Sequence, residues 1–162
     1  MTDINLKQSL TETEAVTLIE LLFFAYRDFV ADPDHILAEL GFGRAHHRIL
    51  HFIGRDPGMT VASLLDILKI TKQSLARVLK ELIDEGYVFQ KEGAVDRRQR
   101  LLHLTVAGGA LRDKLIAPQI ARFERAAQGT GSAAFHEMLL NLIDPENRAV
   151  ASDWIARLEK RV

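Results

Sequence analysis

Apolar residues recur at helical spacing along most of the chain, which predicts a mainly helical protein. A first helix opens at a capping box formed by Thr11 and Glu14, and its apolar stripe continues over residues 16–30. We expect the pair Asp32-Pro33 to break this helix, because it resembles an N-cap followed by a proline in the first helical position. The helix should then restart over residues 34–40 and end at Gly41.

Three shorter helices are predicted in the middle of the chain. The first covers residues 44–53 and is closed by Gly54, and the second covers residues 61–68. Thr71 caps the third, which ends at Gly86 and carries one apolar face, made of Leu75, Val78, Leu79, Leu82 and Ile83. Because a very short turn joins the second and third of these helices, the pattern predicts a helix-turn-helix.

A β-hairpin is predicted directly after this helix pair. Residues 87–91 and 100–104 have the composition of strands, and residues 92–96 provide the turn. We expect Gly93 to take a positive φ in this turn. A hairpin in this place forms the wing of a winged helix-turn-helix.

The rest of the chain returns to helical spacing. Thr105 caps a long helix that should run to about Gln128, with a kink at Pro118, and Asp144-Pro145 splits two further helices. The predicted fold class is mainly α with a small β-hairpin wing. We expect N-terminal helices over residues 1–40, a winged helix-turn-helix over residues 41–105, and C-terminal helices over residues 106–162. The outer helices carry more apolar positions than a small winged helix can cover, so we expect them to form a dimer interface.

The charge is distributed unevenly along the chain. The 162 residues carry a net charge of −1, yet residues 41–105 hold 11 Lys and Arg against seven Asp and Glu. This segment therefore carries +4 and the remainder −5. A basic centre between acidic ends suits a DNA-reading module flanked by helices that stay away from the phosphates.

Several classes of protein are disfavoured by what the sequence lacks. There is no cysteine, and hence no disulfide or thiolate metal site. The longest apolar run is well short of the roughly 20 residues that span a membrane, and no secretory signal pattern opens the chain. We therefore expect a cytoplasmic protein with no membrane partner. We expect neither catalysis nor a cofactor, because no phosphate-binding glycine loop, nucleophile elbow or His-Glu-x-x-His run is present.

The predicted helix after Thr71 has a polar face whose chemistry suits the major groove of DNA. Its members share one side of the helix by their spacing: Gln73, Ala76, Arg77 and Lys80. Gln can bond adenine at two points and Arg can bond guanine at two points, while Ala permits close approach. At the start of the helix, where free N–H groups and the helix dipole favour phosphate, lie Thr71, Lys72 and Ser74.

The predicted wing carries three arginines within four residues, Arg97, Arg98 and Arg100. A basic tip beside a recognition helix can place a guanidinium in the minor groove, where negative potential is concentrated. Asp96 precedes these arginines, and we expect it to orient one of them through a charge-assisted pair rather than to contact DNA.

The succession of these motifs resembles the MarR family of regulators. The pattern Asp96-x-Arg98 in the wing and the exit Leu104-Thr105-x-x-Gly108 match the family, and the spacing fits across the 65 residues from 41 to 105. The resemblance implies a homodimer, a palindromic operator and often a small ligand that releases the DNA. By the same mapping, Arg98 would enter the minor groove and Asp96 would be its partner.

The sequence therefore predicts a sequence-specific regulator that binds double-stranded DNA as a homodimer and acts as a repressor. The alternative is a winged-helix module that binds proteins and does not read DNA specifically. A basic recognition face and a basic wing favour the regulator.

Two further groups of residues have open interpretations. His46, His47 and His51 lie on one predicted helix, and the last two could share a metal ion. Hydrogen-bonded or half-buried histidines are the favoured interpretation, because that helix has no carboxylate or cysteine at a matching spacing. A pocket for a small aromatic or amphipathic effector could be formed by Phe23, Tyr26, Phe42, His46 and Phe52, although core or dimer packing is favoured for the aromatic residues.

Overall fold

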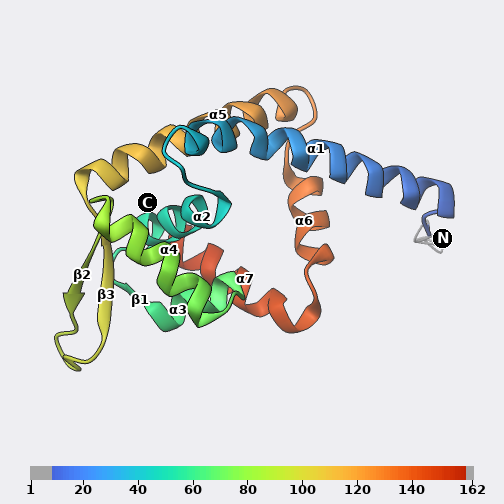
Figure 1. The fold of residues 1–162 in the computed structure, drawn as a ribbon. Coiled ribbons are helices and arrows are strands. Elements are labelled where there is room, and N and C mark those ends of the chain that lie inside the picture. Colours follow the sequence, from blue (N-terminus) through green and yellow to red (C-terminus); the bar gives the residue numbers. More distant parts are fainter. Residues whose placement is uncertain (1–8, 160–162) are drawn as a thin grey trace.

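The computed structural model describes residues 9–159, and the fold is mainly helical with a small three-stranded sheet (Figure 1). This agrees with the fold class expected from the sequence. Residues 1–8 and 160–162, which belong to the expected terminal regions, lie outside the described residues. The elements, in chain order, are α1 (Glu12–Ala38), α2 (Arg44–Arg55), β1 (Met59–Thr60), α3 (Val61–Leu68), α4 (Lys72–Asp84), β2 (Val88–Glu92), β3 (Arg100–Leu104), α5 (Val106–Ala127), α6 (Ala133–Leu142) and α7 (Pro145–Glu159).

The winged helix-turn-helix is built around one apolar core. Helices α2, α3 and α4 and strand β3 contribute side chains with no exposed surface, including Leu50, Ile53, Leu64, Leu75, Leu82 and Leu102. Strand β3 lies between β1 and β2 and pairs antiparallel with both. Strand β1 was not predicted, because two residues are too few to show the alternation by which strands are recognised.

The helix-turn-helix begins and ends where the sequence predicts. The side chain of Thr60 accepts the N–H of Ser63 at the start of α3, and that of Thr71 accepts the N–H of Ser74 at the start of α4. After α4, Gly86 has a φ of 78°. Each of these caps satisfies backbone groups that the helix itself leaves free.

Two predicted interruptions are wrong. Helix α1 is continuous through Pro33, which is buried, and Asp32 pairs with Arg122 of α5 at 3.0 Å instead of capping a new helix. The carbonyl of Phe29, which has no N–H to accept from Pro33 four residues later, accepts the side-chain amide of Gln119 of α5 at 3.5 Å. Gly54 was expected to end α2, but the helix continues through it to Arg55. Glycine is needed there because the side chain of Arg112 packs closely against it: a Cβ would lie 2.3 Å from that side chain.

Helices α1 and α5 pack against each other and run in opposite directions, so that they form one side of the molecule (Figure 1). Helix α5 continues through Pro118, where the expected kink stays a prediction. Helices α6 and α7 are separated at Asp144 and Pro145, as the sequence predicts. Helix α7 returns to the winged helix, where Trp154 packs edge-on against Phe52 of α2. Among the described helices, none is both long and apolar enough to cross a membrane.

Candidate nucleic-acid interface

Helix α4 presents the expected polar face to solvent. Gln73, Arg77 and Lys80 are exposed, whereas Leu75 and Val78 on the opposite side are buried. At the start of α4, Lys72 is exposed, while Thr71 and Ser74 are joined both by the cap and by a bond between their hydroxyl groups at 2.9 Å. The backbone N–H of Ser74 is therefore already bonded to Thr71. The backbone N–H groups of Lys72 and Gln73 are better placed to meet a phosphate.

Each cation on this face has an acidic partner one turn further along α4. Arg77 donates to Glu81 at 3.0 Å, and Lys80 donates to Asp84. Glu81 and Asp84 were not among the residues that the sequence led us to expect at this site. The signal was available, because residues four positions apart are neighbours on a helix.

Glu81 also contacts a buried histidine. Its Oε2 lies 2.7 Å from Nε2 of His46, which is only 6% exposed. The hydrogen bond from His46 lowers the pKa of Glu81, and the nearby charge of Arg77 acts in the same direction. Phe42 stacks on the imidazole, with ring centroids 4.3 Å apart. Phe42 and His46 are therefore part of the packing between α2 and α4.

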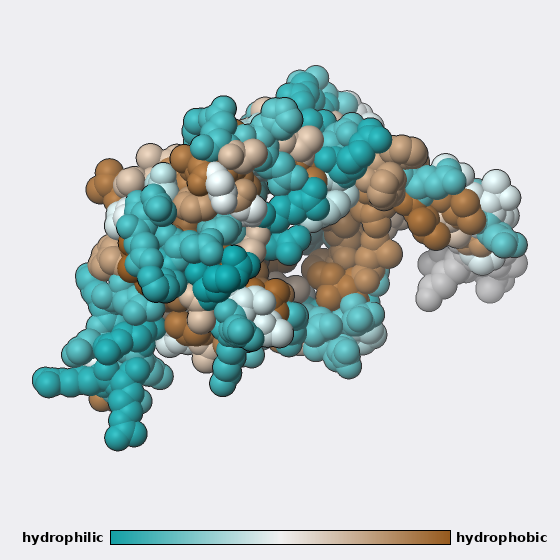
Figure 2. Space-filling view, viewed as in Figure 1, coloured by the Kyte–Doolittle hydropathy of each residue, from teal (hydrophilic) through white to brown (hydrophobic). Residues whose placement is uncertain are grey.

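The wing projects from the body as a polar tip (Figures 1 and 2). Arg97, Arg98 and Arg100 are all exposed, and Arg100 pairs with Glu92 across the hairpin at 3.5 Å. Asp96 accepts the backbone N–H of Arg98 at 2.9 Å, and no ion pair joins it to a guanidinium among the described residues. Asp96 thus shapes the turn in this structure, and its expected pairing with an arginine side chain stays a prediction.

The positive φ expected for Gly93 in this turn is wrong. Its φ does not lie in the left-handed region, and the residue is buried. A Cβ there would lie 2.4 Å from the carbonyl oxygen of Asp96. Glycine is required at this position by the close approach of two backbone segments.

The exit from the wing ties α5 to the end of α4. Thr105 Oγ1 donates to the carbonyl of Gly86 at 2.7 Å and accepts the N–H of Gly108 at 3.0 Å. The N–H of Thr105 donates to the carbonyl of Tyr87 at 3.0 Å, and a Cβ on Gly108 would lie 1.9 Å from that same carbonyl oxygen. The Thr-x-x-Gly pattern therefore has a physical reason, which is a capped helix start that touches the backbone before β2.

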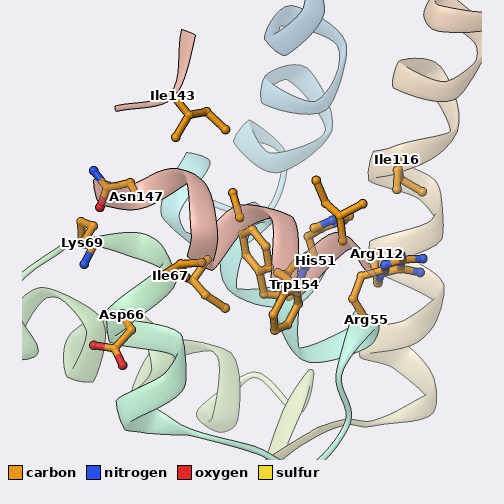
Figure 3. A pocket seen from close by; sticks show the side chains of 14 residues that line it. His51, Arg55, Asp66, Ile67, Lys69, Arg112, Ile116, Ile143, Asn147 and Trp154 are labelled. Carbon is orange, nitrogen blue, oxygen red and sulfur yellow. The ribbon is translucent and has the colours of Figure 1, made fainter. Parts of the chain in front are cut away.

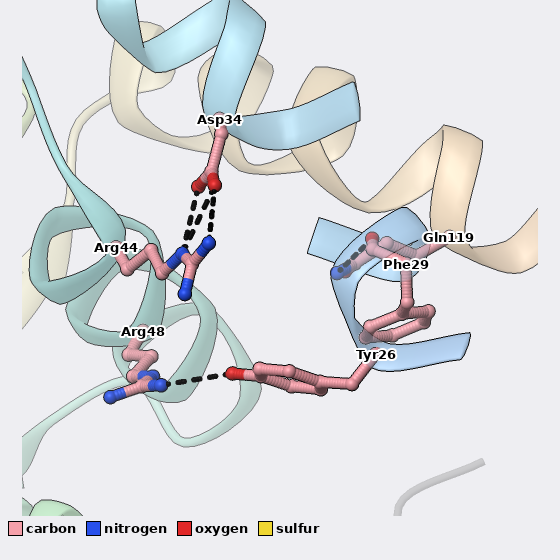
Figure 4. A network of polar contacts seen from close by, with 6 residues as sticks. All are labelled: Tyr26, Phe29, Asp34, Arg44, Arg48 and Gln119. Atoms are coloured by element: carbon pink, nitrogen blue, oxygen red, sulfur yellow. Dashed lines mark hydrogen bonds and ion pairs between the residues drawn. The ribbon is translucent and has the colours of Figure 1, made fainter. Parts of the chain in front are cut away.

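The five residues expected to line an effector pocket do not come together. Phe42 and His46 pack between α2 and α4, and Phe23 is exposed on α1. Tyr26 and Phe52 do line a cavity of about 420 Å³ between α1, α2 and α5. At this junction Arg48 donates to the hydroxyl of Tyr26, Arg44 pairs with Asp34 at 2.9 Å, and Gln119 reaches the carbonyl of Phe29 (Figure 4).

A larger cavity, of about 710 Å³, lies between α2, α3, α5 and α7 (Figure 3). Phe52, Ile116 and Trp154 supply apolar walls. The charged lining residues are Arg55, Asp66, Lys69 and Arg112, the last of which pairs with Asp113 at 3.1 Å. The Nε of Arg112 is buried and has no hydrogen-bond partner among the described residues. Sequence reasoning missed this cavity, because its walls come from segments as far apart as His51 and Ile155.

The other two histidines of α2 are partly buried beside these cavities. Burial lowers the pKa of His47, and burial followed by the charge of Arg112 lowers the pKa of His51 to about 4. Both imidazoles are therefore neutral at neutral pH. Within residues 9–159 no three His, Cys, Asp or Glu residues gather in an arrangement that could hold a metal ion.

Comparisons with known proteins agree with this geometry. Residues 40–99 match the family model of the MarR family. The HTH-type transcriptional regulator PetP of Rhodobacter capsulatus is 46% identical over 142 residues, and the match covers 86% of each chain.

Solved structures of the same family share the fold. A MarR protein of Peptoclostridium difficile has a TM-score of 0.63 at 20% identity, over 91% of this chain and 96% of its own. A MarR family regulator of Listeria monocytogenes, complexed with a 26mer DNA, has a TM-score of 0.64 at 23% identity, over 85% and 91% of the two chains. The identity to PetP over most of both sequences, together with the family match, shows that this chain belongs to the MarR family of transcriptional regulators and is not an enzyme.

Proposed function

We propose that this protein is a homodimeric repressor that binds a near-palindromic operator and releases it when a small effector binds. The observation that carries the proposal is the exposed face of α4, with Gln73, Arg77 and Lys80, beside an exposed arginine-rich wing. Occupation of an operator is enough to exclude other proteins from the DNA, so repression needs no additional activity of the chain.

The residues of the surface divide into base readers and phosphate contacts. Gln73 and Arg77 lie on the exposed side of α4 and have the chemistry to bond adenine and guanine. Lys72 at the helix start and Lys80 further along are suited to phosphates, together with the polar cap residues Thr71 and Ser74. The wing arginines, Arg97, Arg98 and Arg100, would follow the adjacent minor groove and read its width.

Dimerisation is supported by apolar side chains that the chain itself leaves uncovered. Several on α1 and α6 are more than half exposed, namely Ile19, Leu21, Phe23 and Leu142. Figure 2 shows apolar surface over these helices, away from the wing. A second copy that covers this surface would place two copies of α4 about one helical turn of DNA apart, roughly 10 bp, or a multiple of it.

The larger cavity suits an amphipathic effector with an aromatic body and a negative charge. Phe52 and Trp154 would contact the apolar part, and the guanidinium of Arg112, which pairs with Asp113 in the free protein, would meet the charge. The cavity touches α2 and α3 of the winged helix as well as α5. A ligand bound there would therefore change the position of α2 and α3 relative to α5.

The proposal is tested by selecting operators from random DNA and mapping the protected bases. We expect a near-palindromic site, a dimer in sedimentation, and a large preference over random duplex that persists as salt is raised. A monomer at micromolar concentration would contradict the dimer. Equal affinity for selected and random DNA would contradict specific readout and favour a winged-helix module that binds proteins.

A further inference from the structure

Glu81 connects the interior of the protein to the exposed end of Arg77. Its Oε1 accepts Arg77 Nη1 at 3.0 Å, while its Oε2 lies 2.7 Å from His46 Nε2. His46 is buried in α2, whereas the side chain of Arg77 is 68% exposed. The three residues form a continuous path of contacts from the core to the DNA-facing side of α4.

The other ring nitrogen of His46 decides which atom carries the proton. Nδ1 accepts the backbone N–H of Gly43 at 3.0 Å, so the hydrogen of the neutral imidazole lies on Nε2. Nε2 therefore donates to Glu81. The ring is held in this orientation by Phe42, whose plane is within 10° of that of the imidazole. His46 is thus a fixed donor that restricts the carboxylate of Glu81 to one position.

We propose that Glu81, held by His46, is a positioning residue that presents the guanidinium of Arg77 to one base pair of the operator. The inference rests on the proposed function, in which Arg77 reads a base. Arginine has five N–H donors, and Glu81 engages only one of its nitrogens, so the rest of the fork can face guanine. A guanidinium that is already held loses less rotamer freedom when it binds.

The neighbouring pair of Lys80 and Asp84 provides an internal comparison. It has the same spacing and the same charges, but both side chains are more than half exposed. Among the described residues, no buried side chain donates a hydrogen bond to Asp84. An exposed ion pair of this kind restricts the lysine side chain only weakly. The buried donor is what distinguishes Glu81.

The test measures base discrimination, which is the ratio of affinities for the selected operator and for a copy with one base pair replaced. Arg77→Ala identifies the base pair that Arg77 reads. Glu81→Gln should lower discrimination at that same base pair about 2- to 10-fold, because the neutral amide keeps a single acceptor oxygen for which His46 and Arg77 compete, and a less firmly held guanidinium must be ordered on binding. Asp84→Asn removes the same charge one turn away and should leave that discrimination unchanged. In the Arg77→Ala background, Glu81→Gln should have no further effect.

Two substitutions of His46 separate positioning from a purely structural role. His46→Gln keeps an N–H donor near the Nε2 position, whereas His46→Met has a similar length and no donor. Both lose the acceptor for the N–H of Gly43, so both should lower thermal stability. We expect discrimination at the Arg77 base pair to be retained in His46→Gln and reduced in His46→Met.

The outcomes distinguish this inference from the proposed function. If Arg77→Ala loses discrimination at no base pair, Arg77 is not a base reader and the inference falls with that assignment, whereas specific operator binding is decided separately by the comparison of selected with random DNA. If Arg77→Ala does lose it but Glu81→Gln keeps wild-type discrimination, only the positioning role is overturned. The same follows if Asp84→Asn costs as much discrimination as Glu81→Gln, or if the two His46 variants behave alike.

Discussion

The contact between Gly108 and the backbone before β2 leads to a quantitative prediction about stability. A Cβ at position 108 would lie 1.9 Å from the carbonyl oxygen of Tyr87, and separations under 3.0 Å are essentially never observed. In Gly108→Ala the start of α5 and the backbone of Tyr87 must therefore move apart by about 1 Å. That movement strains the bonds from Thr105 to the carbonyls of Gly86 and Tyr87.

The magnitude follows from three contributions. Overpacking typically costs about 1–3 kcal/mol, and the loss of two hydrogen bonds costs about 1 kcal/mol each. Alanine in place of glycine inside a helix restores about 1 kcal/mol. Gly108→Ala should therefore lower the free energy of unfolding by about 2–4 kcal/mol.

The adjacent Gly109 is a matched control, because a Cβ there meets nothing within 4 Å. Gly109→Ala should raise stability by about 1 kcal/mol through helix propensity alone. Urea unfolding followed by circular dichroism, at one protein concentration for all variants, measures both effects. Equal stability of the two variants would refute the reasoning, since it would mean that the exit from the wing tolerates a side chain.

Three other predictions concern the DNA surface and the acid response. Arg98→Ala should weaken operator binding and reduce the slope of log affinity against log salt by about one, with unchanged thermal stability; an unchanged slope would remove the wing arginine from binding. Gln73→Ala should cost about 1–3 kcal/mol of discrimination at one operator position, measured with base-substituted operators; an equal loss on random duplex would identify a phosphate contact instead. Burial lowers the pKa of His51 from 6.5 to about 4, so as the pH falls the imidazole is protonated in the unfolded chain before it is protonated in the folded one. The free energy of unfolding that comes from neutral His51 is therefore fully present above pH 6.5 and is lost as the pH falls toward 4. With allowance for partial exposure the loss at pH 5 should be about 1–2 kcal/mol in denaturant titrations, and His51→Leu should flatten it; parallel curves for the two proteins would contradict this origin.

The helix-turn-helix could be predicted from the sequence because each of its boundaries is local. Thr60, Thr71 and Gly86 act on backbone groups within a few residues, so the residue type is enough to identify the cap. The exposed face of α4 follows from helical spacing in the same way. The basic wing was predictable as well, since its three arginines lie within four residues of the sequence.

The errors occurred where a distant segment decides the outcome. Pro33 remains in a helix because α1 packs on α5, and Gly54 is set by the side chain of Arg112, more than fifty positions later. His46 was expected to be hydrogen-bonded or half-buried, with an effector pocket as the alternative, but its partner Glu81, 35 positions away, could not be named from the sequence. No pattern within a short window carries this information, so long-range contacts had to come from the structure.

The bonds of Thr105 join the start of α5 to the backbone that follows α4, so a tilt of α5 would be passed on to α4. A helix of 22 residues is about 33 Å long, and a tilt of about 5° about its far end displaces the other end by about 3 Å. Successive base pairs are about 3.4 Å apart along each strand. In the proposed dimer, the tilt of α5 would therefore determine the spacing between the two copies of α4 to within about one base pair. A change of a few degrees would give a spacing that no longer matches the two half-sites, although both subunits stayed folded.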